Sequence, residues 1–202
     1  DGFVLYDRAA INFSFDGGRV FAGVAPAKTV DASAPGRQAE TAAPGDDKVV
    51  ADLWHWKDGF VQPMQKVRAS QDRTRSYRAV YDIAAKRFVQ LADPTMAGLT
   101  PSDDGRYSIG TDDRSYRSMV DYDGSYANFY LVDSATADRK LIAEKFRSGG
   151  GFSGGSITWS PNGKHLLQFR DGQWHTLSVP DLKDTNLTAR LGLAFHDEDH
   201  DT

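Results

Sequence analysis

The chain has 202 residues, of which 40% are hydrophobic and 26% are charged, and its 28 acidic and 24 basic side chains give a net charge of -4. This balance, with no basic stripe, argues against a nucleic-acid-binding protein. The absence of cysteine excludes disulfides, thiolate nucleophiles and cysteine-ligated zinc, and no apolar run approaches the roughly 18 residues that a membrane-spanning helix needs.

A short pattern, apolar-x-x-Ser-x-[Asp/Asn]-Gly, occurs three times, at residues 11–17, 99–105 and 157–163. An Asx-Gly pair is typical of a tight turn, since both residues tolerate positive φ and the Asx side chain bonds the local backbone. A run of β-forming residues follows each copy. Each unit is therefore predicted to contain a strand that ends at the serine, a turn and a second strand.

Each unit also contains a later pair of strands around an aspartate turn. Aromatic or β-branched runs end at Asp82, Asp133 and Asp181, which lie 51 and 48 residues apart, and another apolar strand follows each of them. A near-regular period with about four short strands per unit is typical of β-propeller blades. The blades are predicted at about 11–91, 99–146 and 157–188.

The first blade is long because it carries two insertions. Residues 25–48 hold alanine, proline, glycine and charge with little to bury, which predicts a mobile surface loop. A strand is expected next, at 49–56, with Trp54 and Trp56 on one face. The second insertion, 62–76, is polar and compatible with a helix.

Together these features predict an all-β fold in which residues 1–202 form one partial β-propeller domain of about three four-stranded antiparallel blades. Tandem blades are expected to meet edge to edge and to leave open sheet faces, and closed propellers need about four to eight blades. We therefore expect an incomplete ring, a section of a larger one. The chain begins at Asp1 without a methionine or targeting signal, so we expect an excised or processed piece.

Residues 151–155 fit the pattern G-x-S-x-G around Ser153, which surrounds the nucleophile of many serine hydrolases. That chemistry needs a strand before the serine and a helix after it. Here no apolar run precedes the motif, and glycines followed by the β-forming residues 157–159 come after it. We interpret 149–156 as a glycine-rich loop between strands, so Ser153 is not assigned as a nucleophile.

The histidines do not form a predicted site. His196 and His200 are spaced i, i+4, which would suit a metal on one helix face, but the residues before them look like a strand and a polar chain end is typically a solvated loop. His55, His165 and His175 lie in β-type runs without a nucleophile partner. No catalytic, cofactor-binding or metal-ligating residue is assigned, and no cofactor is expected.

Two further groups have a functional and a structural interpretation. The charged segment 112–117 could contact a peptide or another domain, but its alternating charges favour a salt-bridged loop. Trp54 with Trp56, and the aromatic residues within 126–130, could line a binding mouth, although blade packing explains them more simply.

Residues 50–58, Val-Ala-Asp-Leu-Trp-His-Trp-Lys-Asp, followed by 62–67, Gln-Pro-Met-Gln-Lys-Val, resemble a segment in the N-terminal propellers of bacterial peptidases of the prolyl oligopeptidase family. This family includes dipeptidyl and acylaminoacyl peptidases. Residues 103–114, the Ser-Pro-Asn-Gly-Lys box at 160–164 and residues 198–201 are similar to it as well. The resemblance covers nearly the whole chain, and its more specific part is Trp-His-Trp-Lys-Asp at 54–58 followed closely by Gln-Pro-Met-Gln at 62–65.

The resemblance implies a seven- or eight-bladed propeller that caps a C-terminal α/β-hydrolase domain and limits which peptides reach the catalytic serine of its Ser, Asp and His triad. This chain contains no hydrolase domain, so no triad residue can be carried over, nor can the glutamate pair that anchors the substrate amino terminus in some relatives. It is thus expected to be non-catalytic by itself, to gate peptide substrate and to dock the missing hydrolase domain. Because relatives are often exported, the resemblance favours a periplasmic or secreted protein.

A different class of function is also open: a stand-alone periplasmic β-propeller that binds or scaffolds partners, similar to translocation-associated propellers, with no enzyme attached. A peptidase must continue into an α/β pattern with a nucleophile elbow, whereas a scaffold would add only blades.

Overall fold

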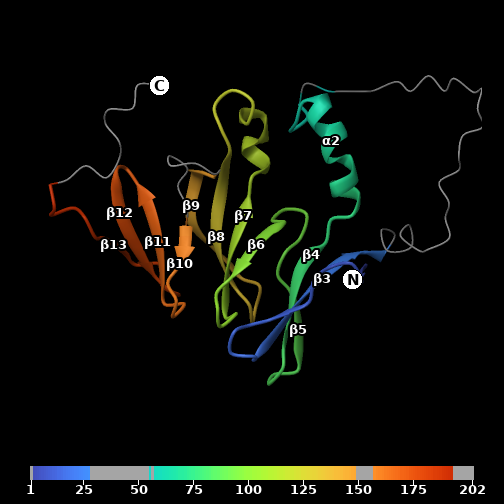
Figure 1. Cartoon of the computed structure of the whole chain (residues 1–202), viewed down its shortest axis with the longest axis horizontal. Helices are drawn as coiled ribbons and strands as arrows, with labels where there is room; N and C mark the ends of the chain where they lie inside the picture. The colour runs from blue at the N-terminus through green and yellow to red at the C-terminus, as the bar shows by residue number, and fades with distance from the viewer. Residues whose placement is uncertain (1, 28–54, 56, 149–156, 193–202) are drawn as a thin grey trace, which may run out of the picture.

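The computed structural model describes residues 2–27, 55, 57–148 and 157–192. In these ranges the chain forms three antiparallel sheets that follow one another along the sequence (Figure 1). One α-helix, α2 (Gln62–Arg73), and one 3-10 helix, η1 (Arg114–Met119), accompany them.

The first sheet has strand order β1-β3-β4-β5, with β2 also paired to β3. Strand β1 pairs with the second half of β3 and β2 with its first half, so these two short strands share one edge of the sheet. The strands are β1 (Phe3–Leu5), β2 (Asn12–Phe13), β3 (Arg19–Pro26), β4 (Tyr77–Asp82) and β5 (Arg87–Gln90).

The second and third sheets each have four strands in sequence order, every neighbour antiparallel, which is the meander of a propeller blade. The all-β prediction of about three four-stranded antiparallel blades is confirmed. The strands are β6 (Gly98–Pro101), β7 (Tyr107–Asp112), β8 (Tyr126–Asp133), β9 (Arg139–Arg147), β10 (Ile157–Trp159), β11 (His165–Arg170), β12 (Gln173–Ser178) and β13 (Asp184–Asn186).

The Ser-x-Asx-Gly repeat forms the same turn in every blade. In the second blade the Ser102 hydroxyl donates to Asp104 Oδ1 (2.8 Å), and the amide of Arg106 donates to the same oxygen (3.0 Å). The amide of Gly105 donates to the Ser102 carbonyl (2.9 Å). Equivalent bonds occur at Ser14 and Ser160. The predicted turns are confirmed.

The blades pack face to face through two apolar clusters. One cluster lies between the first and second sheets and the other between the second and third. Because side chains alternate along a strand, β8 contributes Val132 to the first cluster and Phe129 to the second. The buried members are Phe21, Val80, Leu91, Met96 and Val132 in the first cluster, and Ile109, Ala127, Phe129, Leu166 and Leu177 in the second.

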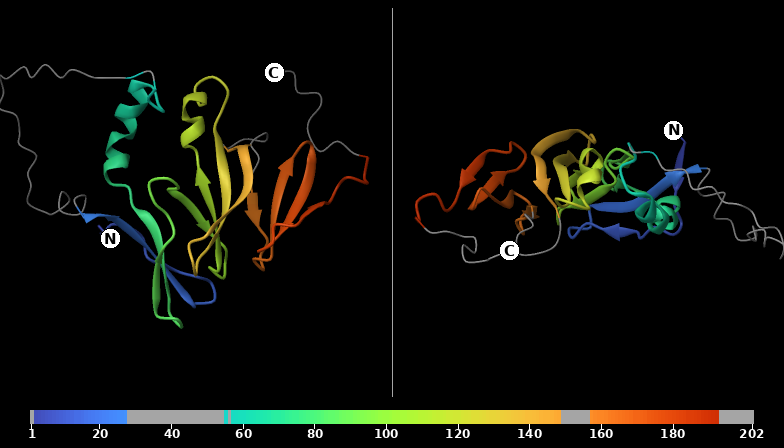
Figure 2. Two further views of the ribbon diagram at one scale, coloured as in Figure 1. Left: turned by 180° about the vertical axis from the view of Figure 1, so that it is seen from behind. Right: turned by 90° about the horizontal axis from the view of Figure 1, so that it is seen from above.

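The prediction that blades meet edge to edge is wrong. In the described residues, strand pairing occurs within each sheet only, and the two apolar clusters fill the space between neighbouring sheets. Seen from above, the three sheets follow one another side by side (Figure 2). The middle sheet has both faces covered, whereas the first and third sheets have one partner each.

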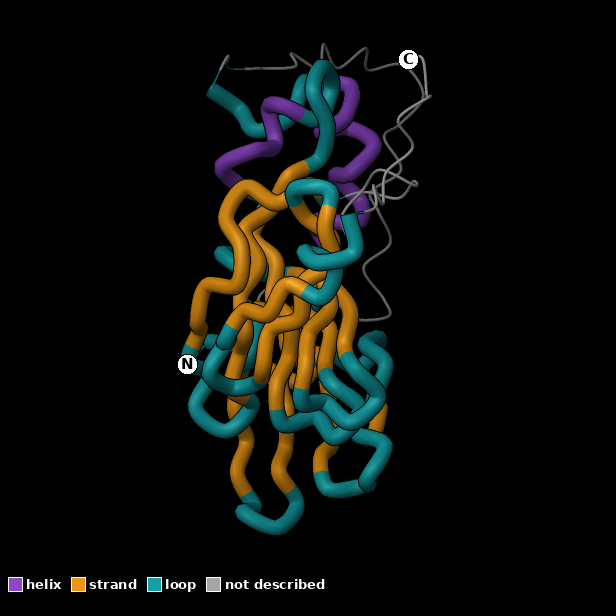
Figure 3. The backbone as a smooth tube through the Cα atoms, turned by 90° about the vertical axis from the view of Figure 1, so that its left-hand side faces the viewer, coloured by secondary structure: helices purple, strands orange, loops and turns teal. Residues whose placement is uncertain are grey.

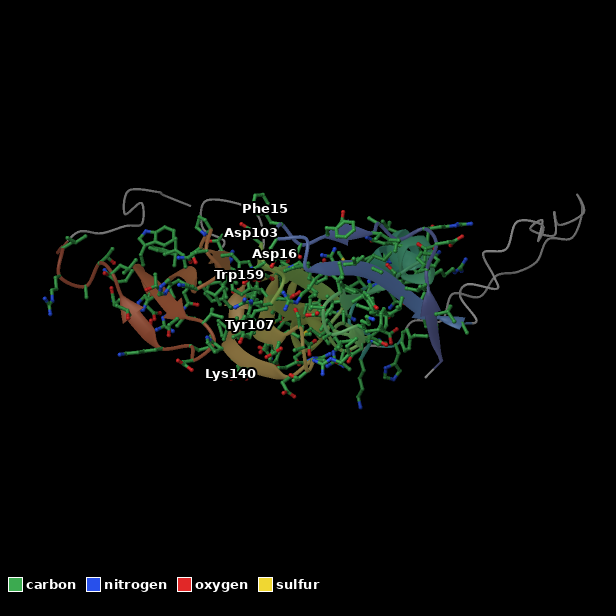
Figure 4. All side chains as sticks on the ribbon, turned by 90° about the horizontal axis from the view of Figure 1, so that it is seen from below. Phe15, Asp16, Asp103, Tyr107, Lys140 and Trp159 are labelled. Carbon is green, nitrogen blue, oxygen red and sulfur yellow. The ribbon has the colours of Figure 1, made fainter. Side chains whose placement is uncertain are left out.

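Hydrogen bonds also join neighbouring blades at the end where the Ser-x-Asx-Gly turns lie (Figure 4). The amide of Phe15 donates to the Asp103 carbonyl (2.7 Å), so the turns of the first two blades are bonded to each other. Between the second and third blades, Trp159 Nε1 donates to the Thr100 carbonyl (3.3 Å). Lys140 Nζ donates to the Asp181 carbonyl (2.9 Å). This end is therefore closed by contacts between blades.

The two helices lie at the opposite end of the strands (Figure 3). Helix α2 confirms the helical interpretation of the second insertion, and Pro63 occupies its first turn, a position where the missing amide donor costs nothing.

The first insertion differs in part from its prediction. Strand β3 continues through Pro26, and Ala25 is buried, because the N-terminal strand β1 pairs with this stretch. Residues 25 and 26 are thus strand, not mobile loop. The insertion from 28 onward, and residues 49–54 and 56 of the predicted strand, lie outside the described residues.

Two turn glycines give a matched test of the contact between the first two blades. Gly105 and Gly163 have nearly equal left-handed φ values of 67° and 66°, so replacing either with alanine should cost about 1–2 kcal/mol from backbone conformation. A Cβ at Gly105 would lie 3.0 Å from Phe21 Cε2, whereas at Gly163 the nearest atom is Asp104 Oδ1 at 3.6 Å. Gly105→Ala should therefore lose about 1–3 kcal/mol more than Gly163→Ala.

Urea unfolding of the two variants and the parent chain measures this difference. Equal losses of unfolding free energy would contradict close packing between the turn of the second blade and Phe21.

Candidate functional site

The residues considered from sequence do not come together in one site. Ser153, His196 and His200 lie outside the described residues. His165 is exposed at the start of β11, where its amide donates to the Ser160 hydroxyl (2.9 Å). His55 lies in neither helix nor strand, and its Nδ1 accepts from the amide of Lys57 (3.1 Å).

His175 belongs to an ionic network that ties three strands of the third blade together. Its Nδ1 lies 3.0 Å from Asp184 Oδ1 on β13 and 3.3 Å from Arg170 Nη2 on β11. Arg170 also pairs with Asp184. These contacts give the buried imidazole a structural role in the blade.

The described part of the chain contains neither a metal-binding cluster nor a membrane-spanning helix. No group of three or more His, Asp or Glu side chains is placed to hold a metal ion. No helix there combines the length and apolarity needed to cross a membrane.

The charged segment 112–117 forms the salt-bridged connection that its alternating charges favoured. Arg114 donates from Nε and Nη2 to the two carboxylate oxygens of Asp112, both at 2.8 Å. These bonds from Arg114 hold the pKa of Asp112 below its ordinary value. Arg117 Nη2 lies 2.8 Å from Asp113 Oδ1, one helical turn away. Both pairs stabilise the passage from β7 into η1.

One of these residues, Arg117, also lines a cavity of about 390 Å³ between the first two blades, at the end that carries the helices. Helix α2 contributes Arg68 to the lining, and Arg75 follows from the segment between α2 and β4. Part of the loop between β5 and β6, including Pro94 and Thr95, lies on another side. The cavity is therefore made by connections from two neighbouring blades.

Phe60 lies against two of the cavity arginines. Its ring centroid is 4.4 Å from the guanidinium carbon of Arg68 and 5.3 Å from that of Arg117, distances at which a cation interacts with an aromatic face. Gln65 Nε2 donates to the Phe60 carbonyl (2.7 Å) and to Asp58 Oδ2 (3.1 Å). The turn before α2 thus holds the aromatic ring in place.

Asp93 anchors the loop on the other side of the cavity. Its Oδ1 accepts from the Thr95 amide (2.7 Å) and hydroxyl (2.5 Å), and its Oδ2 accepts from Arg139 Nη2 of the second blade (2.8 Å). Burial opposes ionisation of this carboxyl, but the bonds from Thr95 and Arg139 outweigh it, so its pKa lies below the ordinary value. Asp93 therefore holds the loop in its turn and ties it to the second blade.

Sequence reasoning identified the charged segment but not Arg68 or Arg75. Arg68 lies within the largely polar helix α2 and Arg75 lies just after it, positions where an arginine is usually solvated. The nearest feature in the sequence is the segment 57–65, whose turn positions Phe60.

Comparison with known proteins found no protein-family model and no curated protein sequence that matches the chain. Among solved structures, it is similar to TolB from Acinetobacter baumannii, with a TM-score of 0.38 and 13% identity over 94% of this chain and 33% of that one. It is also similar to a protein assigned as TolB from Agrobacterium tumefaciens, with a TM-score of 0.34 and 12% identity over 91% of this chain and 67% of that one. The chain thus spans about a third of the A. baumannii protein.

The Asp93 anchor predicts an acid-dependent loss of stability. Because the folded-state pKa is depressed, the carboxylate stabilises the fold above its ordinary pKa of about 3.9, and this contribution is lost as pH falls through the lower folded value. Asp93→Asn should lower the unfolding free energy at pH 7 by about 1–2 kcal/mol, allowing for the partial exposure of the ion pair. At about pH 2.5, below the ordinary pKa, the loss should be smaller than at pH 7, because part of the contribution of the carboxylate is then gone.

Urea unfolding at both pH values checks this. Asp121→Asn is the control, since Asp121 is exposed and its side chain has no hydrogen bond among the described residues. An equal loss for Asp93→Asn at both pH values would contradict the role of its charge.

Proposed function

We propose that this chain is a non-catalytic section of the β-propeller of a prolyl oligopeptidase-like serine peptidase. In this proposal the propeller gates the access of peptides to a C-terminal α/β-hydrolase domain and docks that domain. The supporting observation is the position of residues 57–73, which include much of the segment that resembles the peptidases. Helix α2 of this segment stands over one end of the first blade (Figure 1) and borders the cavity between the first two blades, where an insertion can restrict passage.

An exposed apolar face on the first sheet supports the idea of a larger ring. Phe13, Val20, Tyr81 and Phe88 are paired in register across four strands, so their side chains share one face. The adjacent row, which includes Phe21, packs on the second sheet, so this row faces away from it. Phe13 is 67% and Phe88 is 48% exposed.

Contiguous apolar surface of this kind is usually covered by a partner. Face-to-face packing is how the described blades cover each other, so we infer that a further blade covers this row. The proposed ring would then continue beyond the first sheet.

The alternative function is a stand-alone periplasmic binding scaffold. One observation favours it: the arginine-lined cavity is built from the first two blades and their connections, and needs no second domain to receive a ligand.

A hydrolysis assay tests the proposed lack of catalysis. The 202-residue chain, incubated with chromogenic peptidyl substrates, should release product no faster than buffer, and Ser153→Ala should leave that rate unchanged. Hydrolysis by the parent chain that disappears in Ser153→Ala would place a nucleophile in this chain and overturn the proposal.

A further inference from the structure

We propose that the cavity between α2, η1 and the β5–β6 loop binds a carboxylate carried by a peptide, with Arg68 as its principal cation. The inference rests on the proposed function in taking a peptide as the carrier. The carboxylate site itself follows from the charges and contacts of the cavity.

The lining carries more positive than negative charge, with three arginines, Arg68, Arg75 and Arg117, against Asp113. Arg117 is already paired with Asp113, and Arg75 with Asp72 outside the lining. Among the described residues, Arg68 has no carboxylate partner. One cation of the cavity is therefore left to attract an anion.

Arg68 also carries a hydrogen-bond donor that calls for an acceptor. Its Nε is buried and has no hydrogen-bond partner in the described part of the chain. A buried donor without an acceptor is unfavourable, and a carboxylate oxygen that reaches this guanidinium after a small movement of the atoms covering Nε would satisfy the donor with a charge-assisted bond. The unpaired charge and the unpaired donor thus belong to the same side chain.

The site is ordered before any ligand arrives. The Phe60 ring packs on the guanidinium groups of Arg68 and Arg117, and Arg117 also donates from Nε to Asp113 Oδ1 (3.0 Å). Fixing such long side chains in advance reduces the entropy lost on binding. The planar guanidinium fork matches the geometry of a carboxylate better than a point charge does.

The rest of the lining suits a peptide as the carrier of the carboxylate. Hydroxyl groups of Thr111 and Ser148 can bond peptide amides and carbonyls, and small apolar surfaces come from Pro94, Ala97 and Ala127. A volume of about 390 Å³ lies within the range of small-ligand sites. The end of a peptide or one acidic side chain would fit there.

Isothermal titration of the 202-residue chain at low salt tests the proposal with four probes. These are acetyl-Ala-Ala-Ala with a free C-terminus, the same tripeptide as its amide, acetyl-Ala-Glu-Ala-amide, and inorganic phosphate. At least one carboxylate-bearing peptide should bind, the neutral amide should not, and added salt should weaken binding. Which peptide binds distinguishes a C-terminal carboxylate from an acidic side chain.

Arg68→Gln should weaken binding of that peptide by about tenfold or more, because it removes the fork and the charge. The matched control is Arg106→Gln, which makes the same charge change at the opposite end of the blades, where Arg106 is 68% exposed. It should stay within roughly twofold of the parent. Arg68→Lys, which keeps the charge, should bind more weakly than the parent and serves if the glutamine variant fails to fold.

Equal binding of the neutral amide, unchanged binding by both Arg68 variants, or binding of phosphate alone would overturn the proposal. The hydrolysis assay has a separate readout. If the chain bound the peptide and also hydrolysed peptides through Ser153, the carboxylate site would stand. The proposal of a non-catalytic propeller section would then fail.

Discussion

A sheet with two apolar faces must cover both, and this requirement organises the molecule. The second blade meets it completely: β8 sends Val132 into the cluster with the first blade and Phe129 into the cluster with the third. The outer blades each have one described neighbour. The row from Phe13 to Phe88 lies on the face of the first sheet that no described blade covers.

The same packing explains why the arginine cavity exists. At one end, the Ser-x-Asx-Gly turns are short, and those of the first two blades are bonded to each other through Phe15 and Asp103. Longer connections, α2 and η1, occur at the other end (Figure 1). Because neighbouring blades lie side by side, Arg68 and Arg117 reach one cavity from different blades although they are 49 residues apart.

The repeated features could be predicted from sequence because they depend on local chemistry. A serine, an Asx and a glycine close the same turn wherever they occur, so three copies indicated three blades. Features that depend on distant partners were missed. Phe3–Leu5 becomes a strand only by pairing with the end of β3, and Arg68 is distinguished from a solvated arginine only by the approach of Phe60 and the neighbouring blade.

The central claim is that these blades are part of a larger propeller attached to a hydrolase. Sequencing the parent gene beyond the codon for Thr202 tests it most directly. The account predicts further blade repeats, then an α/β pattern with a G-x-S-x-G elbow between a strand and a helix, followed by an aspartate and a histidine. Blades followed by a stop codon would contradict the peptidase and leave a binding scaffold.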